Sequence, residues 1–156
     1  QQAGEEFEAK LGSVAGHIGA RKLGYRIIIV PPGKKAWPFH AHRVNEEMYF
    51  ILKGSGILRY GEKEYPLVEG DFIAAPPGGE ETAHQIINDG EGKLKYLAVS
   101  TMEEPEVMEY PDSGKFGVLA GSAPGGDKMK RTLHFFGYRS AAVDYWEGES
   151  DCPPSE

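Results

Sequence analysis

Short runs of apolar residues recur through the first hundred residues of the chain, and they are rich in β-branched and aromatic side chains. Each run lasts about as long as a β-strand does, and the period of the apolar positions is mostly short. The pattern therefore predicts six strands. These are residues 25–30, 47–52, 56–60, 71–75, 84–88 and 94–100.

Turn-forming residues separate the predicted strands. The intervening segments, such as PPGKK at 31–35 and PPGGEE at 76–81, are rich in Gly, Pro, Asn and Asp, and the chain contains 21 Gly and 11 Pro. These residues supply turn geometry and stop long helices. Closely spaced strands joined by tight turns indicate an all-β fold, either an antiparallel sandwich or a barrel.

The two ends of the chain carry a different pattern. Residues 5–16 contain enough helix formers to be considered helical, although their glycines weaken the case. After residue 101 we expect an extended acidic arm at 102–115 and a flexible loop at 121–128, followed by one or two late strands. The candidates for these late strands are residues 132–138 and 141–146.

Length and composition favour a single globular domain of 156 residues. Apolar residues make up 40% and charged residues 26%, which suggests neither disorder nor a fibrous repeat. Seventeen basic and 24 acidic residues give a net charge of −7, and this field opposes binding to nucleic acid or to an anionic membrane. A lone cysteine, Cys152, excludes an internal disulfide, and no apolar run approaches the roughly 20 residues of a membrane span, so we expect a cytoplasmic protein.

Two of the five histidines stand one residue apart, at His40 and His42, and two glutamates follow them. In a strand, residues i and i+2 project to the same face, so both imidazoles can converge on one point. A carboxylate from Glu46 or Glu47 would extend this set, because imidazoles and carboxylates bind divalent first-row metals. His84 opens another predicted strand and is the best remaining candidate for a further ligand.

The spacing of these residues resembles the two-part signature of the cupin superfamily. Its first motif contains a Gly, an H-x-H pair, a Glu and a Gly, and its second contains a Gly, Pro-x-Gly, a His and an Asn. The matching residues are Gly33, His40, His42, Glu47 and Gly54 in the first motif and Gly70, Pro76, Gly78, His84 and Asn88 in the second. Two turn insertions, before His40 and before His84, depart from the pattern and are expected to alter the rim of the pocket.

The resemblance implies an antiparallel double-stranded β-helix, or jelly-roll barrel, with three His and one Glu around a single metal. The implied ligands are His40, His42, Glu47 and His84. Glu47 takes precedence over Glu46 because six residues separate it from the glycine that closes the first motif. A ligand set without thiolate suits one divalent transition metal, whether iron, manganese, nickel, cobalt, copper or zinc, better than magnesium or calcium.

The same resemblance places the barrel core at residues 24–100 of a single domain, 1–156. We expect residues 101–156 to form a C-terminal extension that wraps the barrel or a partner subunit. Alternation along the strands and the resemblance together predict a small, mostly apolar pocket. The predicted pocket-lining residues are Tyr49, Ile51, Ile86, Trp37 and Arg26. Tyr49 is the one candidate for a catalytic proton donor, although a buried tyrosine is more often a core residue.

Four protein ligands on an octahedral ion leave two positions for a small molecule, so the site can support chemistry. The resemblance therefore implies a metal-dependent enzyme of the dioxygenase or isomerase type, acting on a small oxygen-rich or aromatic molecule. The alternative is a non-catalytic cupin that binds or senses a small molecule and uses the metal to hold it. Catalytic activity distinguishes the two.

The second face of the predicted strands is also apolar. Its expected residues are Met48, Phe50, Leu52, Ile73 and Ile87. This is more apolar surface than the exterior of a barrel usually exposes. A homodimer would cover it, and the terminal arms are natural candidates to cross between the subunits.

Overall fold

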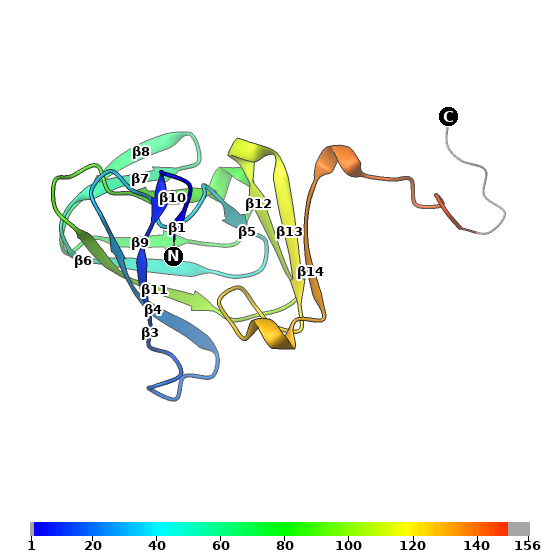
Figure 1. The fold of residues 1–156 in the computed structure, drawn as a ribbon, viewed down its shortest axis with the longest axis horizontal. Coiled ribbons are helices and arrows are strands. Elements are labelled where there is room, and N and C mark those ends of the chain that lie inside the picture. The colour runs from blue at the N-terminus through cyan, green and yellow to red at the C-terminus, as the bar shows by residue number, and fades with distance from the viewer. Residues whose placement is uncertain (1, 150–156) are drawn as a thin grey trace.

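The computed structural model describes residues 2–149, and nearly all of their regular structure is β-strand (Figure 1). This part of the chain forms no α-helix, and its helical turns are the 3-10 segments η1 (Glu80–Thr82), η2 (Pro111–Ser113), η3 (Lys128–Lys130) and η4 (Arg139–Ala141). The predicted all-β fold is therefore confirmed. Cys152 lies outside the described residues.

A five-stranded antiparallel sheet forms one wall of the molecule. Its strands, in spatial order, are β3 (Lys10–Ser13), β4 (Leu23–Val30), β11 (Leu94–Thr101), β6 (Glu47–Lys53) and β9 (Phe72–Ala75). Residues that pair across antiparallel strands share a face of the sheet. Ala98 of β11 pairs with Arg26 on one side and with Tyr49 on the other, so these three side chains form one row on the inner face.

A second antiparallel sheet packs against the inner face of the first. It contains β10 (His84–Ile87), β7 (Gly56–Tyr60) and β8 (Lys63–Leu67). The largest side chains of the shared core come from both sheets, and they include Ile28, Ile51, Leu58, Ile86, Leu94 and Tyr96. Burial of this apolar surface holds the two sheets together.

The third sheet closes the other side and contains the late part of the chain. Its strands, in order, are β14 (Leu133–Tyr138), β13 (Lys115–Ala120), β12 (Glu106–Tyr110) and β5 (Ala41–His42), and all of them are antiparallel. A separate two-stranded sheet joins β1 (Gln2–Ala3) to β2 (Phe7–Glu8). Because β5 belongs to the third sheet while β6 belongs to the five-stranded one, residues 43–46 link two walls of the molecule.

All six strands predicted in the first hundred residues are present, as β4, β6, β7, β9, β10 and β11. Strand β8 was not predicted, because its sequence KEYPL reads as part of a polar turn. It is an exposed edge strand, where charged residues and a proline are tolerated.

The helix considered for residues 5–16 is wrong. Strands β2 and β3 occupy this segment, and β3 pairs with β4 along the edge of the five-stranded sheet. Two glycines, Gly12 and Gly16, weaken a helix here. The edge of β4 offers unpaired backbone groups instead, so β3 gains hydrogen bonds that a marginal helix would have to supply alone.

The extended acidic arm expected at 102–115 is also wrong. Residues 106–110 are strand β12, which pairs with β5 and β13, so this segment is an internal strand of the third sheet. Of the two late candidates, 132–138 contains β14, whereas 141–146 forms no strand. The division of the chain at residue 100, and any wrapping of a partner subunit, stay predictions.

The outer face of the five-stranded sheet is apolar, with one correction to the residues predicted for it. Met48, Phe50 and Leu52 are only half-buried there, and Phe72 of β9 is 73% exposed. Ile87, also predicted on the second face, lies on β10 of the other sheet and is half-buried. Ile73 belongs to the core instead, because it pairs with the inward-facing Tyr49. The parity of β9 could not be assigned from the run DFIAA, in which apolar residues occupy both faces.

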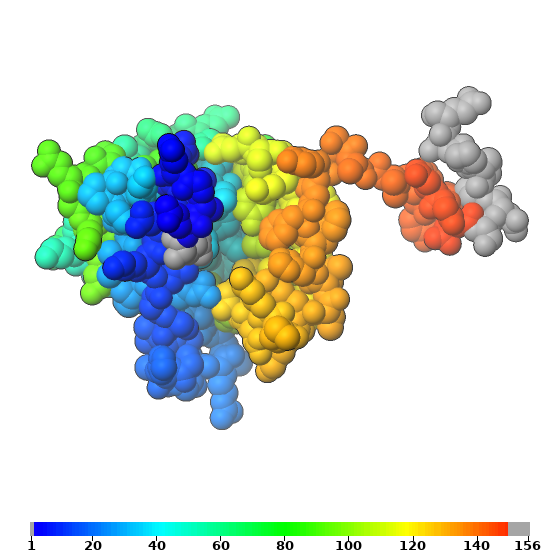
Figure 2. Space-filling model, in the orientation of Figure 1, coloured from blue at the N-terminus to red at the C-terminus, as the bar shows by residue number. Residues whose placement is uncertain are grey.

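Beyond β14, residues 139–149 extend away from the rest of the chain (Figure 2). The base of this arm is held by an ion pair of 2.9 Å between Arg139 and Glu109 of β12. Farther along, Val143, Tyr145 and Trp146 are exposed. Within residues 2–149, no helix has the length and apolar character that a membrane crossing would require.

We propose that a second copy of this chain covers the apolar outer face, with residues 143–146 of the arm in the contact. Phe72→Ser and Trp146→Ser should each shift the protein toward monomer in sedimentation velocity, because each removes a large exposed apolar side chain from the contact. Tyr65→Ser, on the outer edge strand β8, is the control. A monomeric wild type, or a dimer that persists in both variants, would contradict the proposed contact.

Candidate metal centre

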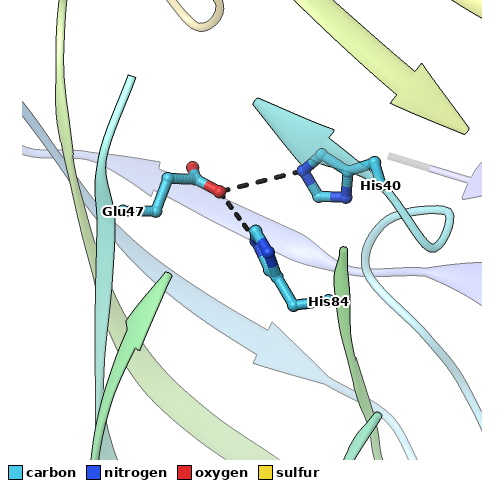
Figure 3. A group of neighbouring side chains, drawn as sticks. All are labelled: His40, Glu47 and His84. Atoms are coloured by element: carbon cyan, nitrogen blue, oxygen red, sulfur yellow. Dashed lines mark hydrogen bonds and ion pairs between the residues drawn. The ribbon is translucent and has the colours of Figure 1, made fainter. Parts of the chain in front are cut away.

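Three histidines and a glutamate meet at one end of the inner face. The Nε2 atoms of His84, His42 and His40 lie 3.0, 3.4 and 3.8 Å from the same carboxylate oxygen, Oε2 of Glu47. Figure 3 shows the side chains of His40 and His84 pointing toward this oxygen. The four residues predicted as metal ligands are thus brought to one point from four positions in the sequence.

The backbone explains this convergence. His40 pairs with His84 through two backbone hydrogen bonds, of 3.2 and 2.8 Å, so their imidazoles leave adjacent strands side by side. His42 follows on the same face two residues later, as expected for extended chain. Glu47 begins β6 and faces inward, as does Tyr49 two residues later.

Each imidazole uses its other nitrogen to fix its orientation. Nδ1 of His40 donates to the carbonyl oxygen of Pro38 at 2.8 Å, and Nδ1 of His84 donates to the carbonyl oxygen of Thr82 at 3.1 Å. Nδ1 of His42 lies 3.1 Å from a carboxylate oxygen of Glu106. Because all three acceptors are oxygens without a proton to give, each Nδ1 carries a proton, and Nε2 is the atom through which each imidazole would bind a metal ion.

Glu106 is fully buried, and the sequence analysis did not identify it. Burial alone raises the pKa of this carboxyl, but hydrogen bonds from His42 and Asn45 outweigh burial and hold the pKa below its ordinary value. Four backbone N–H groups also donate to its oxygens, those of Arg43, Val44, Asn45 and Val107. An ionised carboxylate is therefore stabilised here by N–H donors.

The charges inside the cluster are strongly coupled. Burial lowers the pKa of His42, but hydrogen bonds to Glu106 and Glu47 outweigh it and raise the pKa to about 9. Burial, together with the neighbouring His84 and His42, lowers the pKa of His40 to about 3. Burial raises the pKa of Glu47, yet hydrogen bonds from His42 and His84 hold it well below its ordinary range. Glu47 is therefore ionised and His40 neutral at pH 7.

The hydroxyl of Tyr49 touches the cluster directly. It donates to Oε2 of Glu47 at 2.6 Å and lies 2.9 Å from Nε2 of His84. Burial, followed by the charge of Glu47, raises the pKa of Tyr49 well above its ordinary value. The phenol consequently keeps its proton at neutral pH and can act as a hydrogen-bond donor.

A cavity of about 550 Å³ opens from this cluster, which is within the range of small-molecule sites. Of the predicted lining residues, Tyr49, Trp37 and Arg26 line it. Ile51 and Ile86 lie in the hydrophobic core instead, because each stands two residues farther along its strand than Tyr49 or His84. Met108 and Tyr110 of β12 also line the cavity, and neither was predicted.

The donor set fits a transition metal. His40, Glu47 and His84 offer ligand atoms that lie within 4.8 Å of one another, and His42 presents its Nε2 to the same carboxylate. Imidazole nitrogens combined with one carboxylate suit first-row divalent ions, whereas magnesium and calcium prefer oxygen ligands. The second-layer hydrogen bonds at each Nδ1 are those expected around ligating histidines.

Comparison with known proteins agrees with this geometry. Residues 26–100 match the family described as Cupin domain. The chain contains a cupin domain. The match ends before β12, so Glu106 and the rest of the third sheet after β5 lie outside the matched part of this cupin.

Two curated proteins are similar in sequence to this cupin. An uncharacterized protein of Methanocaldococcus jannaschii is 36% identical over 85 residues, which are 52% of this chain and 65% of that protein. The oxalate-binding protein of Thermotoga maritima is 36% identical over 70 residues, which are 45% of this chain and 54% of that protein. The aligned part of the chain thus spans less than two thirds of either relative.

A solved structure extends the comparison beyond the matched segment. A proposed sugar phosphate isomerase from Acidithiobacillus ferrooxidans is 30% identical in sequence and superposes with a TM-score of 0.65. The superposition covers 70% of this chain and 69% of that protein. The fold of this cupin is therefore shared over more than the 26–100 segment.

Glu106→Gln should lower the affinity of the protein for a divalent metal about 10- to 100-fold, because a neutral amide accepts the Nδ1–H of His42 more weakly than a carboxylate does. Titration against a competing chelator measures this affinity. Glu104→Gln, an exposed residue of the same acidic run, is the matched control. A folded Glu106→Gln protein with wild-type affinity would show that Glu106 supports the fold and not the metal site.

Proposed function

We propose that this cupin is a mononuclear metal-dependent enzyme of the isomerase type, acting on a small oxygen-rich molecule. The observation that carries the proposal is the convergence of three Nε2 atoms on one carboxylate oxygen, next to a cavity of about 550 Å³. His40, His42, Glu47 and His84 would hold one divalent first-row metal ion. The similarity to a proposed sugar phosphate isomerase supports isomerisation over oxidation by dioxygen.

A bound ion would supply Lewis acidity toward the oxygen atoms of the substrate. The other roles belong to the side chains of the chain itself. Tyr49 holds a proton at its hydroxyl oxygen, within hydrogen-bond distance of both Glu47 and His84, and could deliver it to a substrate oxygen. Trp37 and Tyr110 line the cavity and would exclude water from the bound substrate.

A second candidate is a non-catalytic cupin that uses the metal to hold its ligand. The observation in its favour is the similarity to the oxalate-binding protein of Thermotoga maritima. Glu47, which touches the three Nε2 atoms, would be a ligand and not a free base, and this also favours binding alone. The two candidates share the metal site and differ in turnover.

The metal site is tested by elemental analysis of the untagged protein purified without added metal or chelator. We expect about one first-row metal per chain in the wild type, as a mononuclear site requires, and loss of it in His42→Ala and His84→Ala. His134→Ala, which removes an exposed imidazole from β14, should keep the metal. Wild-type protein that stays empty after reconstitution would overturn the proposal.

Tyr49→Phe tests the catalytic candidate. The variant should keep its metal and lose roughly 10²- to 10⁴-fold in turnover, the usual contribution of a positioned proton donor. Aldose–ketose interconversion followed by NMR, together with dioxygen uptake, provides the assay panel. Tyr96→Phe is the control, because Tyr96 is also buried and its ring packs against the Tyr49 ring, with 5.8 Å between the ring centroids. Metal-loaded wild type that binds ligands without turning any over would favour the second candidate.

A further inference from the structure

The three histidines and Glu47 described above are called the His–Glu cluster. Three arginines line the cavity that opens from it: Arg21, Arg26 and Arg131. The chain as a whole carries a charge of −7, so cations gathered at one cavity stand out against the overall field. Among the described residues, no carboxylate forms an ion pair with any of the three. The one acidic residue of the lining besides Glu47 is Asp127, whose Oδ1 accepts from the backbone N–H of Met129 and caps η3.

The sheet register fixes where Arg26 stands relative to the His–Glu cluster. Arg26 and Tyr49 both pair with Ala98, so two strand spacings, roughly 10 Å, separate their backbones on the same inner face. The residue between them is an alanine, and the next row pairs Gly24 with Ser100. These small side chains leave the floor of the cavity open between the cluster and the guanidinium. A molecule of a few carbon atoms can span that distance.

The glycine-rich loop at 121–127 holds this guanidinium in place. Nη2 of Arg26 donates to the carbonyl oxygen of Gly125 at 2.7 Å. Gly125 has a φ of +81°, and a Cβ there would lie 2.6 Å from Nη2 of Arg26. The loop was expected to be flexible from its sequence, but it forms part of the cavity wall through Pro124, Gly125 and Gly126. The positive φ favours glycine at position 125, and a Cβ there would displace the end of the Arg26 side chain.

Arg131 enters the same wall from the segment after η3. Its Nη2 makes a long contact of 3.5 Å to the carbonyl oxygen of Ala123, and its buried Nε has no hydrogen-bond partner among the described atoms. A guanidinium offers five N–H donors in a planar fork that matches carboxylate and phosphate groups. Arg26 and Arg131 each give one N–H donor to a loop carbonyl. Most of the donors of both guanidinium groups therefore remain available to a ligand.

We propose that Arg26 and Arg131 form a binding site for an anionic group of the substrate, at the opposite side of the cavity from the His–Glu cluster. The substrate class is then a small oxygen-rich molecule that bears a phosphate monoester or a carboxylate remote from its metal-binding end. Arg21, an exposed residue of the same lining, adds positive charge. This inference rests on the proposed function and specifies the substrate class of that site.

The test uses the metal-loaded protein and two simple probes, inorganic phosphate and acetate, each titrated at constant ionic strength balanced with chloride. The Nε–Hε signals of arginine in NMR spectra report on the guanidinium groups, and Arg26→Gln and Arg131→Gln assign them. We expect saturable shifts of both signals in wild-type protein. Saturation by phosphate alone would select a phosphate monoester, and saturation by acetate alone would select a carboxylate.

Binding should weaken about tenfold or more in Arg26→Gln and in Arg131→Gln, since each loses charge-assisted hydrogen bonds. Gly125→Ala should also weaken binding, because the added Cβ displaces Arg26 without changing its charge. Arg131→Lys, which retains charge without the planar fork, should fall between wild type and Arg131→Gln. Lys95→Gln, an exposed residue on β11, removes the same charge elsewhere and should bind as wild type does.

Absence of saturable shifts in the wild type would overturn the proposal, and so would equal weakening in Lys95→Gln, which would indicate a general charge effect. Metal content is measured on every sample. Loss of metal from the wild type would count against the proposed function, whereas loss of anion binding with metal retained counts against the arginine site alone. The two failures are therefore distinguishable.

Discussion

The buried carboxylate of Glu106 determines how the His–Glu cluster is assembled. A carboxylate that is removed from water must be surrounded by N–H donors, or burial would drive it to the neutral form. Glu106 meets this requirement by collecting backbone N–H groups from residues 43–45 and the Nδ1 proton of His42. The segment that links two sheets is therefore drawn toward β12. As a consequence, His42 is held in the orientation that turns Nε2 toward Glu47.

The core of the site could be predicted because its spacing follows from the geometry of a strand. His40 and His42 share a face for any extended chain, and the resemblance to cupins selected Glu47 and His84. The pairing of His40 with His84 in the structure agrees with that selection. The remaining positions depended on tertiary contacts. Glu106 stands in the acidic run EEPE, where a solvated glutamate is the ordinary interpretation, and only its neighbours in space identify it as buried.

The errors in the fold have the same origin. Apolar alternation determines that a segment is a strand, but the inner face is known only when one residue of the strand is anchored, as the predicted ligand Glu47 anchors β6. In DFIAA no such anchor exists, so Ile73 was placed on the wrong face. The N-terminal residues 10–13 form a strand because β4 offers an edge there, and edge availability is a property of the assembled sheet.

The part of the chain outside the matched cupin segment forms much of what surrounds the His–Glu cluster. Glu106, Met108 and Tyr110 come from β12, the loop at 121–127 covers Arg26, and Arg131 lies in the same wall. Cupins share their fold among many activities, so a common ligand set cannot define a substrate. In this chain the matched segment supplies the four predicted ligands and Arg26. The later segment supplies the surfaces that a ligand would contact once held there, so differences in substrate among related chains should depend on residues after 100 more than on the shared motifs.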